Sequence, residues 1–260
     1  MFKYIKFIKE HKFWGKSIPD FLNWIKNKSI KHWIILDCET TGLRSDPYEV
    51  QLTQVGCIVV KYDFESNSFK EVGNFNKKIK LTEKTTELMR DPEHRIHKVL
   101  QFNHYFDDPQ ELNQEENVLK DLFEYISEFE KPVLVIQNAE FDMKYLNTRN
   151  SIVKFDNEVI DTKQVIQLFY LPAIQKLAEN NIEYKNLINK IGISDRDNGL
   201  ISSSMGKIGP ALGIDMSGYH DALVDCRLTM KMLVKILDFL KENPDIDILK
   251  YQAERIKTKR

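Results

Sequence analysis

The most constraining feature of the sequence is an apolar run, His32–Leu36, that leads directly into the acidic turn Asp37–Gly42. A short apolar run is typical of a buried strand, and successive side chains of a strand point to opposite faces. Asp37 and Glu39 therefore share one face, whereas Cys38 points away from it. Two carboxylates on one face can grip a hard divalent cation, so the pattern predicts a metal site that needs further ligands. The alternative is an ordinary strand end with acidic turn residues.

A second acidic motif follows a short predicted strand at Val133–Ile136. The chain continues as Gln137–Asp142 and then as a predicted helix, which places Asp142 in the first helical turn. An acid in that position also interacts favourably with the helix dipole, so a surface role is the alternative for Asp142. Asp161, which is predicted to cap the helix after another strand, is a rival for the same functional role.

The third motif, His220–Asp225, opens a long helix whose apolar residues recur with helical spacing to about Leu240. His220 and Asp225 lie about one and a third helical turns apart, on neighbouring faces. An imidazole titrates near neutral pH and can accept a proton from water. A lone histidine near a helix start is more often a packing or surface residue, so the interpretation of His220 depends on the other two motifs.

Taken together, the three motifs resemble the DnaQ-like 3′-to-5′ exonucleases, in the DEDDh branch that has four acids and a histidine. The resemblance extends from about Trp33 to Leu240. It implies an α/β fold of the ribonuclease-H-like type, in which helices flank a mixed five-stranded sheet with an antiparallel second strand. It also implies two Mg²⁺ or Mn²⁺ ions and a general base, His220. The metal ligands implied by the resemblance are Asp37, Glu39, Asp142 and Asp225.

The resemblance also implies which residues lie beside the terminal nucleotide. Leu43 would pack against its base without reading the base's identity. One departure is Gln137, where the family often has histidine. Glutamine forms hydrogen bonds but does not titrate, and because no family role in proton transfer belongs to this position, activity is expected to survive the change. The implied substrate-binding residues are Thr40, Thr41, Gly42, Leu43, Asn138 and Phe141.

The resemblance implies an enzyme that releases nucleoside monophosphates from 3′ ends, and single-stranded DNA is favoured over RNA as the expected substrate. Two cations suit this chemistry because the attacked phosphodiester is already anionic and gains negative charge during the reaction. An exoribonuclease, a non-catalytic nucleic-acid-binding module and a ribonuclease-H-type endonuclease are the alternatives. The sequence is compatible with a freestanding enzyme and with a proofreading subunit that has a polymerase or replication partner.

Charge is distributed unevenly, although the net charge is only −1. Residues 1–31 carry a net charge of +6 and residues 250–260 a net charge of +4. We therefore expect a basic, aromatic-rich extension (1–31), an exonuclease domain (32–240) and a basic tail (241–260). The aromatic side chains of the extension could stack on bases, pack as an amphipathic helical arm or bind a membrane surface, and the packed arm is favoured. These aromatic residues are Phe2, Tyr4, Phe7, Phe13, Trp14, Phe21 and Trp24.

Cysteine usage and hydropathy predict the cellular setting. Cys38, Cys57 and Cys226 have no metal-ligand spacing, which favours reduced thiols in an intracellular protein. No apolar run approaches the length of a membrane span, and the lysine-rich start lacks the apolar centre of a signal peptide. The sequence therefore predicts a cytoplasmic enzyme with one catalytic domain.

Overall fold

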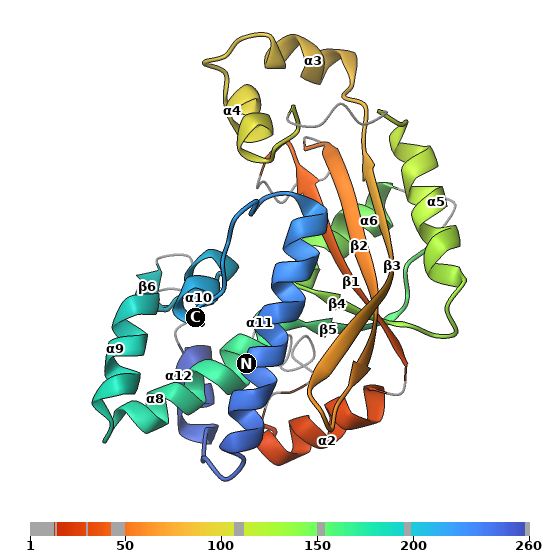
Figure 1. Ribbon diagram of the computed structural model, residues 1–260. Coiled ribbons are helices and arrows are strands. Elements are labelled where there is room, and N and C mark those ends of the chain that lie inside the picture. Colours follow the sequence, from red (N-terminus) through yellow and green to blue (C-terminus); the bar gives the residue numbers. More distant parts are fainter. Residues whose placement is uncertain are drawn as a thin grey trace.

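Five strands form one mixed sheet in the order β3-β2-β1-β4-β5 (Figure 1). In this computed structural model, β1 pairs with β2 and β2 with β3 in antiparallel fashion, whereas β4 and β5 extend the sheet in parallel with β1. The expected mixed five-stranded sheet with an antiparallel second strand is confirmed. The strands are β1 (His32–Thr40), β2 (Leu52–Asp63), β3 (Ser68–Lys78), β4 (Val133–Ile136) and β5 (Glu158–Asp161). The structure describes residues 13, 15–29, 31–42, 50–106, 112–149, 154–194 and 199–257.

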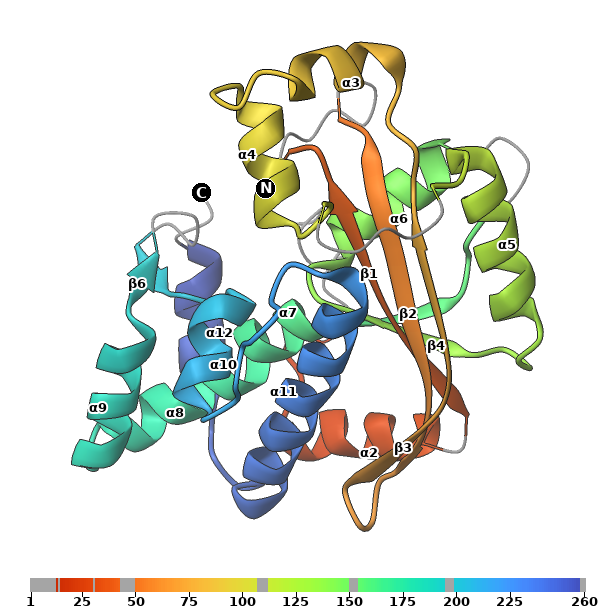
Figure 2. The ribbon, with the colours of Figure 1, turned by 45° about the horizontal axis from the view of Figure 1, so that its top comes forward.

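Helices cover both faces of the sheet. Figure 1 shows α11 along one face and α5 and α6 along the other. Figure 2 shows α3 and α4 over one end of the sheet, close to the start of α11. The remaining elements form a group beside α11. The helices are α2 (Ile18–Lys28), α3 (Glu83–Met89), α4 (Arg95–Phe102), α5 (Glu115–Ser127), α6 (Ala139–Arg149), α7 (Thr162–Val165), the π-helix η1 (Ile166–Tyr170), α8 (Leu171–Ala178), α9 (Ile182–Ile191), α10 (Met205–Ala211), α11 (Ala222–Glu242) and α12 (Leu249–Lys257), and a small hairpin pairs β6 (Ile193–Ser194) with β7 (Leu200–Ile201).

The alternation of side chains along β1 divides the core into two layers. Trp33 and Ile35 pack into the cluster that includes α11, whereas Ile34 and Leu36 pack into the cluster beneath α5 and α6. Cys38 belongs to the second cluster, as its predicted direction requires. Because both faces are buried, a one-residue slip of β1 would exchange its two sets of side chains, so the register that presents its acids is strongly fixed.

A glycine in β2 sets how closely α11 approaches the sheet. Gly56 pairs with Asp37 in the ladder between β2 and β1. A Cβ atom at Gly56 would lie 2.8 Å from the backbone of both Ala222 and Leu223 at the start of α11. The missing side chain therefore lets the first turn of α11, which carries Asp225, lie against the strand next to the acidic end of β1.

The N-terminal region joins the main core where the structure describes it. Phe13 and Phe21 are buried, and their rings contact each other and Phe169 of η1. The packed-arm interpretation therefore holds for α2, and these two rings are not available for stacking on bases. The other named aromatic residues of the extension, apart from the partly buried Trp24, are Phe2, Tyr4, Phe7 and Trp14, which lie outside the described residues.

The C-terminal region also packs on the body of the protein. Tyr251 and Gln252 of α12 are buried, and the Gln252 side chain donates a hydrogen bond to the carbonyl of Leu168, 2.7 Å away. The division into extension, domain and tail thus stays a prediction about function. None of the helices in the described ranges combines the length and the apolar character needed to cross a bilayer. All three cysteines are buried and free.

Gly56→Ala should destabilise the protein by about 1–3 kcal/mol, because the new methyl group meets helix backbone that cannot rotate away. Gly73→Ala in β3 is the matched control: there the Cβ would meet the hydroxyl of Tyr125, the far end of a side chain that can move. Urea unfolding measures both. Equal losses in the two variants would contradict the claim that Gly56 sets the position of α11.

Candidate active site

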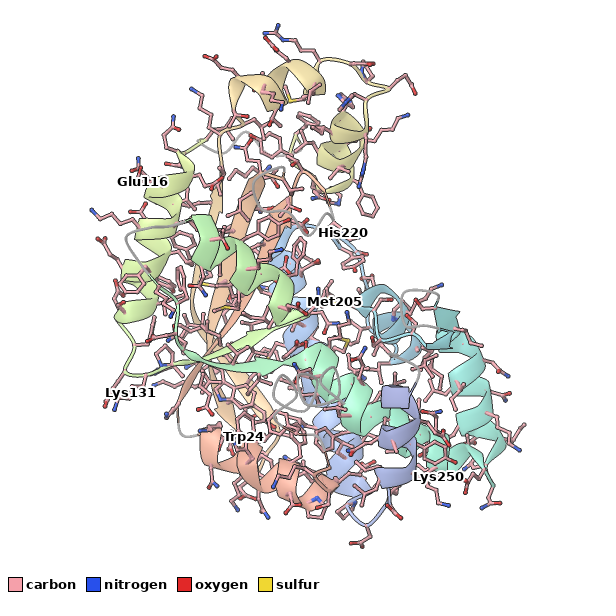
Figure 3. All side chains as sticks on the ribbon, turned by 180° about the vertical axis from the view of Figure 1, so that it is seen from behind. Trp24, Glu116, Lys131, Met205, His220 and Lys250 are labelled. Carbon is pink, nitrogen blue, oxygen red and sulfur yellow. The ribbon has the colours of Figure 1, made fainter. Side chains whose placement is uncertain are left out.

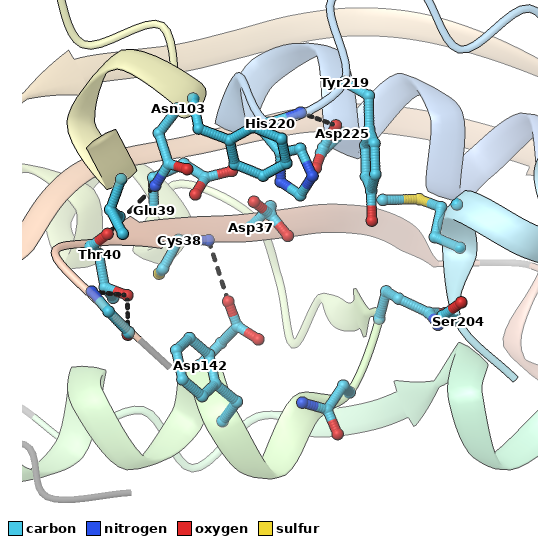
Figure 4. A pocket seen from close by; sticks show the side chains of 18 of the residues that line it. Asp37, Cys38, Glu39, Thr40, Asn103, Asp142, Ser204, Tyr219, His220 and Asp225 are labelled. Carbon is cyan, nitrogen blue, oxygen red and sulfur yellow. Dashed lines mark hydrogen bonds between the residues drawn. The ribbon is translucent and has the colours of Figure 1, made fainter. Parts of the chain in front are cut away.

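The acidic end of β1 opens into a cavity of about 530 Å³. Asp37 and Glu39 reach it from β1, Asp142 from α6 and Asp225 from α11, so the fold brings the four predicted acids to one place. His220 lines the same cavity from the loop before α11 (Figures 3 and 4). Asp37 is partly buried, and the other three carboxylates are almost fully buried.

Asp142, rather than Asp161, belongs to this cavity. One carboxylate oxygen of Asp142 accepts a hydrogen bond from the backbone N–H of Cys38 at 2.9 Å, which ties α6 to the end of β1. Asp161 caps α7 instead, by accepting bonds from the N–H groups of Lys163 and Gln164, and it is not among the residues that line the cavity. The position of Asp161 is therefore explained by helix capping.

The loop before α11 fixes the other half of the site. His220 has a φ of +78°, which is uncommon for a residue other than glycine. Its backbone N–H donates to Asp225 Oδ1 at 3.1 Å, while the neighbouring Asp221 caps the helix through Leu223 and Val224. Gln54 of β2 donates to Asp221 Oδ2 at 2.9 Å and accepts from the N–H of Ala222. These bonds hold the start of α11 against the sheet.

The four acids repel one another in this setting. Burial, followed by the charge of Asp221, raises the pKa of Asp37 to about 7. Burial, followed by the charge of Asp37, raises the pKa of Asp225 to about 9. The pKa values of Glu39 and Asp142 are raised well above the ordinary value by the same two causes, burial first and Asp37 second. A cluster that resists ionisation in this way is suited to cations that neutralise it.

Burial, and secondarily the neighbouring His104, lowers the pKa of His220 to about 4. The imidazole is therefore neutral near pH 7 and has a nitrogen lone pair that can accept a proton or bind a metal. Glu39, His220 and Asp225 each offer one ligand atom within 4.8 Å of the others, the one such group of three or more among the described residues. The donor set of carboxylate oxygens fits Mg²⁺ or Mn²⁺, and the geometry alone leaves His220 open as a ligand or as a base.

Four of the six predicted substrate-binding residues line the cavity: Thr40, Gly42, Asn138 and Phe141. Thr41 does not, because its hydroxyl accepts a hydrogen bond from the backbone N–H of Gln51 at 3.0 Å and is directed to the neighbouring chain segment. The prediction for Thr41 therefore finds no support in its position. Leu43 lies outside the described residues.

Several cavity residues escaped the sequence analysis. Arg95 and Phe102 come from α4, a region without a recognisable motif, and Lys163 follows Asp161. Tyr219 directly precedes His220, and this position next to a recognised motif is the sequence feature that could have indicated its place in the cavity. Arg95 and Lys163 are the two basic side chains of the lining; Lys163 Nζ donates to Asn138 Oδ1 at 3.0 Å.

Comparison with known proteins identifies the domain type. A protein-family model described as "Exonuclease" (RNase_T) matches residues 34–233, which is most of the chain. A search of curated proteins found no match. The resemblance to DnaQ-like exonucleases that the motifs suggested is confirmed by the family match.

Solved structures share the fold at low sequence identity. Exonuclease I of E. coli in complex with a dT13 oligonucleotide superimposes with a TM-score of 0.57 at 18% identity, covering 82% of this chain and 42% of that one. A product-bound exonuclease I gives 0.50 at 15% identity, covering 82% and 46%. The nuclease domain of 3′hExo, a DEDDh family member bound to rAMP, gives 0.48 at 13% identity, covering 84% and 95%. The chain spans less than half the length of exonuclease I.

In the metal-free protein, the free energy of unfolding should fall as the pH rises from about 4, near the ordinary pKa of an aspartate, to about 7. The pKa of Asp37 is raised to about 7 by burial and Asp221, so the folded state keeps a proton that the unfolded state has released. The stability from that proton is fully present below the unfolded pKa and is lost between the unfolded and the folded pKa, at up to about 1.4 kcal/mol per pH unit.

Asp37→Asn removes this titration and should flatten the slope. Urea unfolding in the presence of a chelator compares the two proteins, and the difference between them cancels the titration of distant groups. Identical slopes would contradict the proposed repulsion.

Proposed function

Because this chain belongs to the exonuclease family, we propose that it removes nucleoside monophosphates from the 3′ ends of single-stranded nucleic acid with two divalent ions. The observation that supports this proposal most strongly is the convergence of four carboxylates and one neutral imidazole in one cavity. The chemistry of this donor set suits phosphodiester hydrolysis, and no thiol or serine nucleophile is required.

The residues that would hold the ions are Asp37, Glu39, Asp142 and Asp225. Two divalent ions, when bound, would supply the positive charge that stabilises the incoming hydroxide and the departing 3′ oxygen. The carboxylates of Asp142 and Asp225 each accept a backbone N–H, so their positions are set before any ion arrives. Mg²⁺ or Mn²⁺ are the proposed metals, because both prefer oxygen ligands.

His220 would act as the general base. Its imidazole is neutral near pH 7 because burial and His104 lower its pKa to about 4. In this role a ring nitrogen takes the proton of the attacking water, while the backbone N–H of the same residue keeps Asp225 in place. The proposed role of base competes with the role of metal ligand that the distances to Glu39 and Asp225 also permit.

The proposed substrate is a strand with a free 3′ end, and single-stranded DNA is favoured. A cavity of about 530 Å³ is of the size of a small-molecule site, which suits one end of a strand better than an intact duplex. Thr40, Gly42, Asn138 and Phe141 would surround the terminal nucleotide, and Arg95 and Lys163 could meet its phosphates.

Structural relatives add support for the choice of DNA. The related exonuclease I was solved in complex with a dT13 oligonucleotide. An exoribonuclease is the alternative function. If the substrate is DNA, a polymerase or another replication protein is the proposed partner.

Matched DNA and RNA oligonucleotides, labelled at the 3′ or at the 5′ end, test the function. With Mg²⁺ or Mn²⁺, a 3′ label should appear at once as mononucleotide, whereas a 5′ label should give a descending ladder. Faster loss of the RNA would favour the exoribonuclease. A circular single-stranded DNA should remain intact; its cleavage would identify an endonuclease and overturn the proposal.

Asp142→Asn should abolish turnover, by at least about 10³-fold, because it removes a ligand from a shared site whose members act as a unit. Asp161→Asn is the matched control, since asparagine also caps helices well and the residue lies outside the cavity. Rates on a 3′-labelled oligonucleotide measure both. A near-normal Asp142→Asn enzyme together with an inactive Asp161→Asn enzyme would reverse the assignment.

His220→Ala should lower the rate by about 10²- to 10⁴-fold while both metals still bind. Isothermal titration with Mn²⁺, paired with single-turnover rates at saturating metal, separates the two possible roles. Loss of one metal site in this variant would show that His220 is a ligand. Asparagine can form hydrogen bonds but cannot accept the proton. If His220→Asn restored the rate, His220 would not be the general base.

A further inference from the structure

The imidazole of His220 lies between two aromatic rings. The ring of Tyr219 is 3.8 Å away between centroids, with an interplanar angle of 34°. The ring of Phe102, from α4, is 4.1 Å away at an angle of 41°. Phe102 and Tyr219 are 117 residues apart in the sequence, so only the fold brings them together around His220. All three side chains line the cavity, and Figure 4 shows Tyr219 beside His220.

Aromatic contacts are the main restraint on this imidazole. Catalytic histidines are usually oriented by a hydrogen bond from the second ring nitrogen to a carboxylate or carbonyl group. Within the described ranges, the hydrogen bond of His220 is made by its backbone N–H, and neither ring nitrogen has a partner. The rings of Phe102 and Tyr219 are therefore the side-chain contacts that are left to restrain the imidazole.

Contacts of neighbouring segments fix the positions of Tyr219 and of the chain next to Phe102. Tyr219 packs against α10, where a Cβ atom at Gly206 would lie only 3.3 Å from its Cε1. Beside Phe102, Asn103 donates a hydrogen bond to the carbonyl of Thr40 at 3.1 Å. The buried Lys78 donates to the carbonyl of Tyr105 at 3.1 Å, which fixes the chain just after α4.

We propose that Phe102 and Tyr219 are positioning residues that clamp the imidazole of His220 in the orientation needed for proton transfer. The proposal rests on the proposed role of His220 as general base. The rings of Phe102 and Tyr219, each in contact with the imidazole, restrict rotation about χ1 and χ2 of the histidine and shield its faces from water. This accounts for Phe102, a residue that is 61% exposed although it lines the cavity.

A different role for Phe102 would be direct contact with the substrate. An exposed phenyl ring at a nucleic-acid site can stack on a base. The two roles differ in one measurable respect: a positioning residue acts through His220, so its loss should not matter once His220 is gone. A stacking residue acts on the substrate and should matter equally with and without His220.

A double-mutant cycle separates these roles. Phe102→Leu and Tyr219→Leu are each made in the wild type and in His220→Ala, and single-turnover rates are measured on a 3′-labelled oligonucleotide at saturating enzyme and metal. Phe106→Leu is the matched control, because Phe106 is also an exposed aromatic residue just after α4 but does not line the cavity. Tyr219→Phe tests whether the ring or the hydroxyl group matters.

Each leucine variant should be about tenfold slower in the wild type, the scale of one aromatic contact, and less than about twofold slower in His220→Ala. Tyr219→Phe should recover most of the rate that Tyr219→Leu loses, and substrate affinity should hardly change. Equal losses in both backgrounds, or no loss in the wild type, would overturn the clamp.

A wild-type rate for His220→Ala would overturn the proposed base itself, which is a separate result from failure of the clamp. Because Phe102 is exposed, its substitution is expected to leave folding intact. Urea unfolding checks this for every variant. A rate loss in Tyr219→Leu that Tyr219→Phe fails to recover would also count against a role for the ring.

Discussion

The burial of four carboxylates in one cavity, where they also repel one another, is the constraint on which this structure depends. Burial raises their pKa values, so the folded chain tolerates them only because strong packing elsewhere holds the elements that carry them. Two apolar clusters, one on each face of the sheet, supply that packing. The arrangement is a functional site maintained at a cost in stability, and cations would remove much of that cost.

Backbone hydrogen bonds place the acids. Asp142 and Asp225 come from helices on opposite faces of the sheet, yet each accepts an N–H group from a different segment of the site. Gln54 stands opposite Glu39 in the ladder, next to a β-bulge in which β2 has one extra residue, Thr53, and its side chain ties the start of α11 to β2. Bulges often redirect side chains at active sites, and this bulge of β2 lies opposite the step from Glu39 to Thr40.

Sequence patterns predicted what local rules determine. Strand alternation placed Asp37 and Glu39 on one face, and capping rules placed Asp161 at a helix start. That Asp142 and not Asp161 lines the cavity followed from the family motif and not from capping. The burial of α2 follows the helical spacing of Ile18, Phe21, Leu22 and Ile25, so a packed arm could be predicted. The contact between Phe102 and His220 joins distant segments and leaves no periodic trace in the sequence. The prediction for Thr41 came from family resemblance, which does not show that its hydroxyl bonds to Gln51.

The central claim is that the four acids form one site for two divalent ions, and anomalous X-ray scattering from crystals soaked in Mn²⁺ and a nucleoside 5′-monophosphate tests it most directly. The account predicts two peaks about 3.5–4 Å apart among Asp37, Glu39, Asp142 and Asp225, with the imidazole of His220 outside both coordination shells. A single peak held by Glu39, His220 and Asp225, with Asp142 unliganded, would contradict it.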